Sequence, residues 1–480
     1  MKRFPMAFIL SLLVVSSIFA QDVNNFDKFR NEILGGYRGF REQMLNDYAK
    51  FLEDVWKEYN IFRGEERDKT PKPIVVPNIE NIPVDPLPVM LPTPDYPGPY
   101  TPIVPDSLQD IPPVPSVVNA LDFDFYGIQY HAPQLTPFHI EGKEETDIAK
   151  AWLFYLKNMS EDVISSLKAI VATNGLNDWY ALQMIQRYVN TLIRGGSATD
   201  RIVLEHFLLV NWGFDVRIAR TDKQFVLLIP FQQGIYERRY IVINGQKYYI
   251  FLDEVDGVHE EVPSLYTCLL PENLDLGKSL NLLFMRDVKI VAGNSKHRKL
   301  SDGVITIEGD VNILLMEMLR HYPQMDVSEY AKSSISTSFR DGILKQMKLQ
   351  IEGFSQRDAA NRLIHFVQYA FDYATDGEQH GYEKAYFFEE NFYYPKNDCE
   401  DRAIFYAFLV RSLLGLDVHL IEYPGHECTA VNFTDEGIIG NGYLYEGKRY
   451  VICDPTYIGA SIGMCMPDYK NVKPVIELWY

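Results

Sequence analysis

Cysteine and positive charge are both scarce in this chain, and each shortage excludes a class of protein. Five cysteines among 480 residues are too few for a disulfide framework, and the odd number leaves at least one thiol unpaired. The 46 Lys and Arg residues are outnumbered by 65 Asp and Glu residues, which gives a formal charge of −19. Affinity for nucleic acid rests mainly on Lys and Arg, so we expect no nucleic-acid partner. For Cys268, Cys428, Cys453 and Cys465 the pairing stays open, and buried, reduced thiols are the simplest expectation.

Long apolar runs are absent after the first 20 residues. Lys2 and Arg3 precede about a dozen apolar residues that end at Ala20, as in a secretory signal peptide. We expect cleavage before Gln21 and a periplasmic or secreted protein, with no lipid anchor because no cysteine follows the cleavage point. No later stretch approaches the roughly 18 continuous apolar residues of a membrane span, so none is expected in the mature chain. An uncleaved N-terminal anchor is the alternative.

Several motifs of cofactor chemistry are missing as well. The chain has no phosphate-binding glycine loop, no serine nucleophile elbow and no dinucleotide fingerprint, so nucleotide-dependent chemistry has no support and no cofactor is expected. The composition is nevertheless that of a folded protein, since 47% apolar and 13% aromatic residues suffice for two or three domains with large cores.

Two segments of different character follow the signal peptide. Residues 21–69 carry large apolar residues three or four apart, from Phe26 to Phe62, which predicts helix that docks on the parent domain or on a second copy. Self-association through residues 24–62 is therefore one expectation. Residues 70–116 are rich in proline and predict an extended spacer or a strap over the surface; a docking site for a proline-reading partner is the alternative.

The remaining chain shows the same pattern twice. Residues 199–216 align with residues 400–418 if one residue is inserted, and each segment is followed by strand-like runs and a hairpin signal. We predict a tandem duplication, with units at 117–275 and 276–480. Chance similarity between two helix-strand-strand segments is the alternative, because each element follows a generic periodicity.

Cys399 is the strongest candidate for reactive chemistry. Asp398 and Asp401 mark the start of a helix whose apolar stretch covers residues 403–414, so Cys399 falls in its first turn. The free amides and the positive end of the helix dipole favour a thiolate there. Glu400 and Asp401 act against a thiolate unless they face solvent or pair with Arg402 or another cation, so the fold must supply the cation.

His426 and Asp454 are the expected partners of that thiol. His426 opens a predicted strand after a Pro-Gly turn, and Asp454 ends another strand just before a proline. Antiparallel pairing of these strands would place the carboxylate beside the imidazole. A thiol, an imidazole and a carboxylate in this relation form a site for acyl transfer through a thioester.

Three short motifs resemble the transglutaminase-like superfamily: Asp-Cys-Glu-Asp-Arg at 398–402, Tyr-Pro-Gly-His at 423–426 and Cys-Asp-Pro-Thr-Tyr at 453–457. The resemblance covers residues 358–457 and the upstream copy. It implies an α+β fold with a papain-like core, in which a Cys-bearing helix packs on an antiparallel sheet, and it carries the catalytic roles onto Cys399, His426 and Asp454. The superfamily includes cross-linking enzymes, peptidases, deamidases, amidases and inactive members, so the resemblance does not define the reaction.

In the alignment of the two copies, the first copy lacks all three candidate catalytic residues. The alignment places Ala198 where Cys399 stands, Gln224 where His426 stands and Leu252 where Asp454 stands. We therefore expect the first copy to serve as a scaffold or to hold substrate.

An aromatic and acidic segment at 378–394 has no counterpart in the first copy and is placed to wall a cleft. Candidate oxyanion donors within it are Gln379, Asn391, Tyr393 and Tyr394, with ordinary loop packing as the alternative.

A zinc site at Cys399, His426, Cys428 and Cys453 is less favoured. Strand alternation points Cys453 away from the face that bears Asp454, and the chain has no close cysteine pair. We expect no metal.

These observations favour an exported thiol-dependent hydrolase or acyltransferase that acts on peptide or protein amide bonds. Hydrolysis is the preferred reaction, because transamidation requires that water be excluded in favour of an amine. A noncatalytic scaffold or binding protein of the cell envelope is the alternative.

Overall fold

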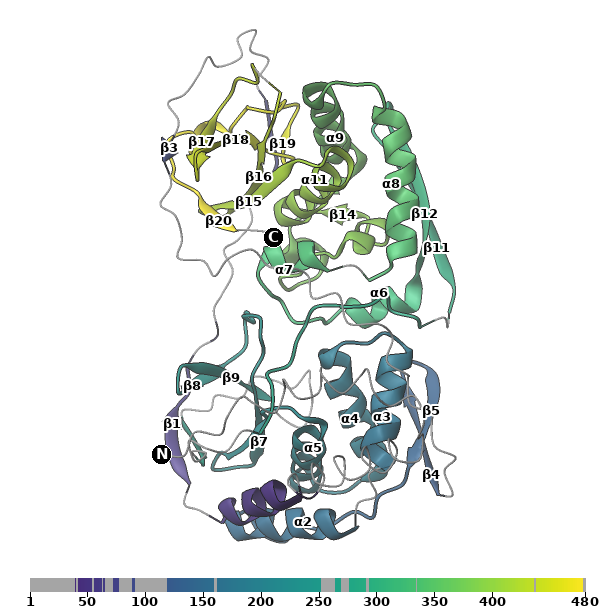
Figure 1. Ribbon diagram of the computed structural model, residues 1–480, viewed down its shortest axis with the longest axis vertical. Coiled ribbons are helices and arrows are strands. Elements are labelled where there is room, and N and C mark those ends of the chain that lie inside the picture. The colour runs from purple at the N-terminus through teal and green to yellow at the C-terminus, as the bar shows by residue number, and fades with distance from the viewer. Residues whose placement is uncertain are drawn as a thin grey trace, which may run out of the picture.

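Helices and strands are mixed throughout the protein, which confirms the α+β class. The computed structural model describes residues 39, 42–53, 56–62, 64, 72–76, 89–90 and 119–477, except for 159–161, 252–263, 269–275, 291–292, 334 and 436. The described residues form two lobes, here called the N-lobe (residues 119–280) and the C-lobe (residues 293–477), which lie one below the other in Figure 1. The predicted signal peptide and most of the proline-rich segment fall outside the described residues.

The N-lobe begins with a hairpin, continues with four helices and ends in a sheet. Its elements are β4 (Ala120–Phe125), β5 (Ile128–Pro133), α2 (Glu145–Asn158), α3 (Asp162–Thr173), α4 (Asp178–Leu192), α5 (Ala198–Trp212), β6 (Arg217–Arg220), β7 (Phe225–Ile229), β8 (Tyr240–Ile243), β9 (Gln246–Phe251) and β10 (Ser264–Thr267).

The C-lobe follows a similar course, with additional short elements before its last helix. Its elements are β11 (Ser295–Ser301), β12 (Thr306–Asn312), α6 (Ile313–Leu319), α7 (Val327–Lys332), α8 (Thr337–Ile351), α9 (Gln356–Ala370), β13 (Asp372–Tyr373), α10 (Asp376–Gln379), η2 (Phe388–Phe392), β14 (Lys396–Asn397), α11 (Cys399–Leu414), β15 (Asp417–Tyr423), β16 (His426–Asn432), β17 (Gly442–Tyr445), β18 (Lys448–Cys453), β19 (Tyr457–Ile458), η3 (Pro467–Tyr469) and β20 (Val475–Glu477).

The main sheets of the two lobes share their strand order. Five strands run β10-β6-β7-β9-β8 in the N-lobe and β20-β15-β16-β18-β17 in the C-lobe. The register is also the same between β6, β7, β9 and β8 of the N-lobe and between β15, β16, β18 and β17 of the C-lobe. Adding 202 to the residue numbers of one sheet converts its pairs into those of the other, so Ala219↔Val226 corresponds to Ile421↔Cys428. In each lobe a helix, α5 or α11, directly precedes these strands.

Both predicted hairpins are present, and their turns follow from their residue types. Asn244 and Gly245 have φ values of 51° and 82°, and Glu446 and Gly447 have φ values of 49° and 77°. Two consecutive left-handed residues form the turn that best matches the twist of a hairpin, and glycine adopts this conformation without a steric cost.

Helix α11 lies at the centre of the C-lobe, among α7, α8, α9 and strands β15 and β16. It begins at the cap residue Asp398 and ends at Gly415, which has a φ of 66°. Nearly every side chain from Cys399 to Val410 is buried. A helix surrounded by protein on all sides needs apolar residues on all faces, which explains the apolar run at 403–414.

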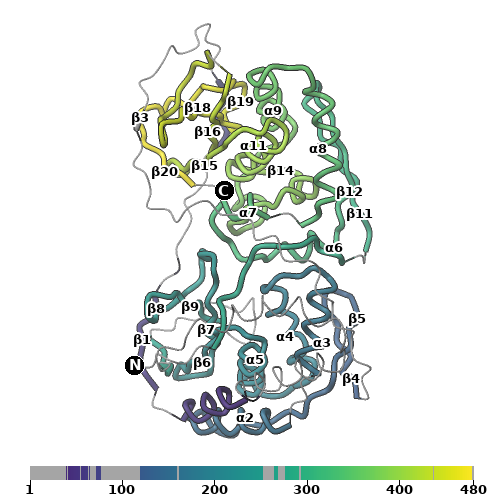
Figure 2. Tube along the Cα trace, viewed as in Figure 1, coloured from purple at the N-terminus to yellow at the C-terminus, as the bar shows by residue number. Residues whose placement is uncertain are grey.

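The two lobes share one apolar core. Phe284 and Tyr322 stack on each other with ring centroids 5.6 Å apart, and each also contacts Phe387 at 5.5 Å. Figure 2 shows how the trace passes between the lobes through this region. The 378–394 segment therefore rests on residues that join the lobes.

The N-terminal helix prediction is correct only in part. Residues 42–51 are helical, and Leu45, Tyr48, Ala49 and Leu52 are buried in the shared core. These apolar residues are thus used within the chain, and self-association through residues 24–62 stays a prediction. Residues 57–60 form strand β1 and not helix, because they pair antiparallel with β10 and obtain their main-chain hydrogen bonds from that edge. Residues 24–38 lie outside the described part.

The described parts of the proline-rich segment lie against the C-lobe. Strand β2 (Ile74–Val75) pairs in parallel with β19, and strand β3 (Val89–Met90) pairs in parallel with β17. This is the strap arrangement that the sequence offered as one outcome. Across the part of the chain that the structure describes, no helix combines the length and apolar character of a membrane span.

Candidate active site

Cys399 is the first residue of α11, as the capping pattern predicted, and its side chain is completely buried. The backbone N–H of Glu427 donates to the Cys399 Sγ at 3.3 Å, and the thiol donates to Glu400 Oε2 at 3.4 Å. Since Glu427 directly follows His426, the thiol lies against the start of β16. The sequence prediction that a strand-borne histidine meets the start of the helix is therefore consistent with the packing.

His426 and Asp454 are hydrogen-bonded to each other. The distance from His426 Nε2 to Asp454 Oδ2 is 2.9 Å, and both side chains are buried. Antiparallel pairing of β16 with β18 brings the beginning of one strand to the end of the other, which is the arrangement the sequence predicted. The other ring nitrogen, Nδ1 of His426, has no hydrogen-bond partner within the described residues. An imidazole held at one nitrogen leaves the other available for proton transfer.

The loop after Asp454 is organised by two side chains. Asp454 Oδ1 accepts the backbone N–H groups of Thr456 and Tyr457 at 2.9 and 3.2 Å. Gln368, a buried residue of α9, donates to the carbonyls of Asp454, Tyr457 and Ala460 at 3.3, 2.9 and 3.0 Å. Sequence reasoning missed Gln368, because a polar residue in an amphipathic helix carries no local sign of a partner some 90 positions away.

Tyr469 covers the imidazole and was also missed. Its ring is stacked on that of His426, with centroids 5.2 Å apart and planes at 14°, and on that of Tyr423 at 4.8 Å. Tyr469 belongs to the short helix η3 and is itself only partly buried. The pKa of its hydroxyl is raised, first by burial and also by the nearby Asp454 carboxylate. Tyr469 thus lies between the candidate triad and solvent.

The electrostatic surroundings of Cys399 differ from the expectation. Burial raises the pKa of the Cys399 thiol well above its usual range, and the carboxylates of Glu400 and Asp398 raise it further. Glu400 and Asp401 are both buried, so the condition that they face solvent is not met. Arg402 does not neutralise them by a direct ion pair; it donates to Asn397 Oδ1 at 2.9 Å and to the Phe371 carbonyl at 3.0 Å. In this closed arrangement the cysteine is a thiol.

The carboxylates around the helix start serve to anchor the inserted segment. Asp376 Oδ2 accepts the backbone N–H of Lys384 at 2.5 Å, and Asp401 Oδ1 accepts that of Tyr386 at 2.8 Å. Burial and the neighbouring Glu400 raise the pKa of Asp376 to about 10. Asp401 therefore attaches the segment to α11, whereas Asp376, the first residue of α10, holds the backbone at Lys384.

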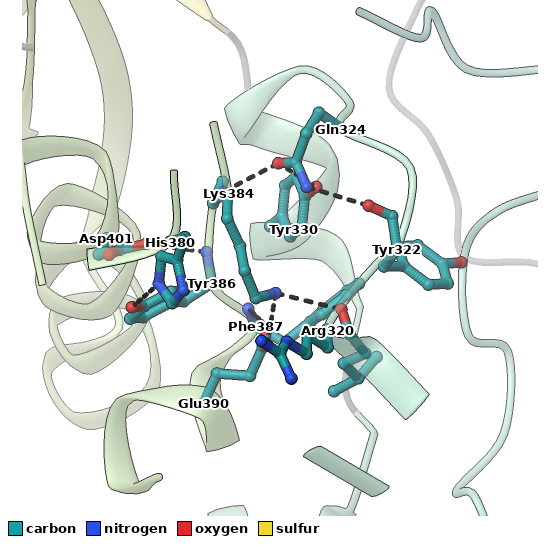
Figure 3. A network of polar contacts seen from close by, with 12 residues as sticks. Arg320, Tyr322, Gln324, Tyr330, His380, Lys384, Tyr386, Phe387, Glu390 and Asp401 are labelled. Carbon is teal, nitrogen blue, oxygen red and sulfur yellow. Dashed lines mark hydrogen bonds and ion pairs between the residues drawn. The ribbon is translucent and has the colours of Figure 1, made fainter. Parts of the chain in front are cut away.

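A buried ion pair lies within the same segment, and its lysine is also hydrogen-bonded to the end of α6. Figure 3 shows Lys384 between Glu390 and the chain at α6, with Nζ–Oε1 at 2.6 Å and a hydrogen bond to the Leu319 carbonyl at 3.2 Å. The backbone N–H of Ala385 donates to Gln324 Oε1 at 2.9 Å. These contacts give the insertion a fixed position next to the start of α11.

The four candidate oxyanion donors lie within this segment, but their polar contacts lead elsewhere. Gln379 donates to the Lys396 carbonyl at 3.1 Å, and Asn391 Oδ1 accepts from Asn397 at 3.0 Å. Tyr394 stacks on Tyr386 at 5.0 Å, and Lys296 approaches the ring of Tyr393 at 4.7 Å. Within the described residues, none of these side chains is hydrogen-bonded to the candidate triad. Their contacts fit the loop-packing alternative.

The pH dependence of stability offers a test of this buried acidic region. Glu389 is fully buried, its Oε1 accepts the Ser336 N–H at 2.8 Å, and burial raises its pKa to about 7. The pKa of Glu389 is higher in the folded protein than its value of about 4.3 in the unfolded chain. The folded protein is therefore more stable at low pH, where Glu389 is protonated, than at high pH, where it is ionised. This contribution, ~3 kcal/mol in full, is lost as the pH rises from about 4.5 through 7.

Replacing Glu389 with Gln keeps the acceptor for Ser336 and removes the titration. Urea unfolding at pH 5 and pH 8 is expected to show a smaller loss of stability for Glu389→Gln than for the unmodified protein, by ~2–3 kcal/mol. Asp376 and its neighbours are present in both proteins, so the difference isolates Glu389. An equal pH dependence of the two proteins would show that Glu389 is ionised throughout.

Within the described residues, three sets of side chains have metal-ligand spacing, one of them being Asp376, Glu383 and Glu400. The ligand atoms of His426, Cys428 and Asp454 lie within 4.8 Å of one another, and so do those of Asp376, Asp398 and Asp401. Of these groups, His426 and Asp454 are already hydrogen-bonded to each other, and Asp376 and Asp401 accept the backbone N–H groups of Lys384 and Tyr386. Cys453 belongs to the cluster on the α11 side of the sheet, whereas Cys428 belongs to the opposite one, which agrees with the predicted alternation. All five cysteines are unpaired and buried, as the simplest expectation held.

The N-lobe has no reactive groups at the corresponding positions that the structure describes. Ala198 is the first residue of α5, and Gln224 immediately precedes β7; Leu252 lies outside the described residues. Supporting contacts do correspond. Asp200 accepts the N–H of Ile140 at 2.9 Å, as Asp401 accepts that of Tyr386. The N-lobe thus retains the anchoring carboxylate at its helix start without the thiol.

Comparison of the chain with protein-family models, with curated proteins and with solved structures found no match.

Proposed function

We propose that this protein is an exported, thiol-dependent hydrolase or acyltransferase of transglutaminase-like type, acting on amide bonds of peptides or proteins. The observation that carries the proposal is the His426–Asp454 hydrogen bond of 2.9 Å beside a helix-initial cysteine, whose Sγ is 3.3 Å from the amide that follows His426. The first contact pairs the imidazole with the carboxylate, and the second places the thiol against the residue that follows the imidazole; the proposed reaction requires the three groups to act together.

In the proposed reaction the Cys399 proton passes to His426, and the thiolate attacks the carbonyl carbon of the scissile amide. The C–N bond breaks, the imidazolium protonates the leaving amine, and the acyl group remains on Sγ as a thioester. Water or a second amine, deprotonated by His426, then attacks the thioester and regenerates the thiol. Asp454 orients the ring and stabilises its charged form without taking up the proton itself.

The site must open before it can react, because Cys399, His426 and Asp454 are all at most 2% exposed. Opening would separate the thiol from the Glu400 carboxylate and admit substrate. A charged Cys–His pair would then be favoured over the neutral pair by the free amides at the start of α11.

We also propose that the lobes are copies of one papain-like unit. The support is the common strand order, the constant register and a repeated contact: Tyr248 donates to Asp215 at 2.6 Å, and Tyr450 donates to Asp417 at 2.8 Å. In this proposal the N-lobe is a scaffold or holds substrate.

One observation favours the noncatalytic alternative, a scaffold of the cell envelope. The pKa of Cys399 is raised by burial and by carboxylates, the opposite of the usual environment of a nucleophilic cysteine. Catalysis requires that the cover over the site moves, whereas a scaffold has no such requirement.

Alkylation of Cys399 by iodoacetamide distinguishes the two proposals. In the protein comprising residues 21–480, opening of the site is expected to expose Cys399 as an activated thiolate. Its labelling at pH 6 is then expected to exceed that of the buried Cys428 at least tenfold, and His426→Ala is expected to remove the excess. Peptide mass spectrometry reports all five thiols at once, so the other cysteines serve as internal references. Equally slow labelling of Cys399 and Cys428 in both proteins would contradict an activated thiol and favour the scaffold.

A further inference from the structure

A short extended segment of the proline-rich region lies beside the candidate site. Strand β2 pairs in parallel with β19, with Ile74 opposite Tyr457, and the N–H of Val76 donates to the Ile458 carbonyl at 2.9 Å. In Figure 1 a short purple segment runs next to β19, in the other lobe from the purple strand β1. The edge of β19 therefore accepts a peptide strand through main-chain hydrogen bonds.

Side chains of this segment alternate between the protein and solvent. Ile74 and Val76 pack on an apolar cluster, whereas Val75 between them is 67% exposed. On the C-lobe side this cluster includes Tyr457, Ala460, Met466 and Tyr469. Alternation with a period of two is what an extended peptide shows when one of its faces is bound.

The surface under β2 is continuous with the candidate triad. Tyr457 donates its backbone N–H to Asp454 Oδ1, and Tyr469 packs both on this cluster and on the ring of His426. Ile74 and Val76 therefore help to hold in place the tyrosine that covers the imidazole. Release of β2 would free one side of Tyr469.

One charge contact completes the description of the bound segment. Lys72 Nζ lies 3.5 Å from Glu378 Oε1, and both side chains are largely exposed. Exposed ion pairs add little affinity, but their sign selects among ligands. A ligand with a basic residue two positions before its first buried apolar side chain would place its charge near Glu378, as Lys72 does.

We infer that the edge of β19 is a peptide-binding subsite of the proposed enzyme, and that residues 72–76 occupy it in cis and keep the site closed. The ligand it takes is an extended peptide with a basic residue, followed at the second and fourth positions by apolar side chains. The closure of the active site by residues 72–76 rests on the proposed function, whereas the binding of a peptide at β19 does not. The substrate class is accordingly an extended polypeptide rather than a small amide.

Displacement of the strap tests the inference. In Ile74→Asp/Val76→Asp both carboxylates would have to enter the apolar cluster, so β2 is expected to detach. Val75→Asp is the matched control, because that side chain already faces solvent. The milder variant Ile74→Ala/Val76→Ala removes the same contacts without new charge, and circular dichroism checks that each protein is folded.

The first readout is fluorescence anisotropy with a labelled peptide of sequence Lys-Pro-Ile-Val-Val and a second peptide with Asp in place of Ile. The detached variants are expected to bind the first peptide at least tenfold more tightly than the second, and more tightly than the Val75→Asp protein does. Equal, weak binding of the peptide to the detached variants and to the control would overturn the subsite.

The second readout is the rate of Cys399 alkylation, which is expected to rise at least tenfold in the detached variants and to fall again when the peptide is added. Peptide binding without any rise in alkylation would leave the subsite standing and contradict the closed-enzyme proposal. A rise in alkylation without peptide binding would overturn the subsite and retain the thiol chemistry. The two failures are thus distinguishable.

Discussion

Replacing Cys399 with Ala is expected to abolish turnover of amide substrates in the proposed reaction, because the thioester of that reaction forms on the Cys399 Sγ. Asp454→Asn keeps the shape of the side chain but removes the charge that accepts from His426 Nε2 at 2.9 Å. The loss of the correct tautomer is expected to lower kcat by roughly 10³–10⁴-fold, with a much smaller change in KM. Release of ammonia or amine from a library of extended peptides, followed by mass spectrometry, measures both effects.

Cys428→Ser is the matched control for these substitutions. Cys428 is a buried cysteine two residues from His426 on the same strand, and it has no role in the proposed reaction. Its replacement is expected to leave kcat within a few-fold of the unmodified value. Turnover by Cys399→Ala at the unmodified rate, or an equal loss of kcat in Cys428→Ser and Asp454→Asn, would contradict the assigned roles.

Replacing Lys384 with Met is expected to produce the largest loss of stability in the C-lobe. Lys384 and Glu390 are both at most 1% exposed, and their charges are 2.6 Å apart. Removing the cation leaves a buried carboxylate without its counter-ion and breaks the hydrogen bond to the Leu319 carbonyl, which costs about 3–5 kcal/mol in comparable cases. The midpoint and slope of urea unfolding measure this change.

Two further variants separate the charge effect from simple packing. Lys384→Met/Glu390→Gln removes both charges and is expected to recover most of the loss, because an uncompensated buried charge is what destabilises the single variant. Lys72→Met removes an exposed pair with Glu378 and is expected to have a negligible effect. If the double variant were as unstable as Lys384→Met, the loss would come from packing rather than from charge.

The elements that carry the triad were predictable because each has a local signature. Asp398 and the following apolar run placed the start of α11 at Cys399, and the Asn-Gly and Glu-Gly turns placed the hairpins. Strand β16 begins at His426, as predicted, and strand β18 ends at Cys453, one residue before the predicted end at Asp454. Once helix and strands were placed, antiparallel pairing was enough to bring Asp454 to His426.

The residues that cover and support the site had no such signature. Tyr469 and Gln368 act over 43 and 86 positions of sequence, on His426 and Asp454 respectively. Residues 57–60 have apolar spacing compatible with helix, yet the free edge of β10 makes them a strand. Contacts of this kind depend on which surfaces meet, and a periodic pattern does not encode its partner.

By itself, the sequence determined where the thiol, the imidazole and the carboxylate stand on their elements, since helix caps, turns and alternation act over a few neighbouring residues. Only the tertiary structure decided the state of that site. It buried Glu400 and Asp401 beside the thiol, placed Tyr469 over the imidazole and laid Ile74 and Val76 against the same cluster. The physical reason is that desolvation and packing depend on residues hundreds of positions apart, so the environment of a group is a property of the fold and not of its motif.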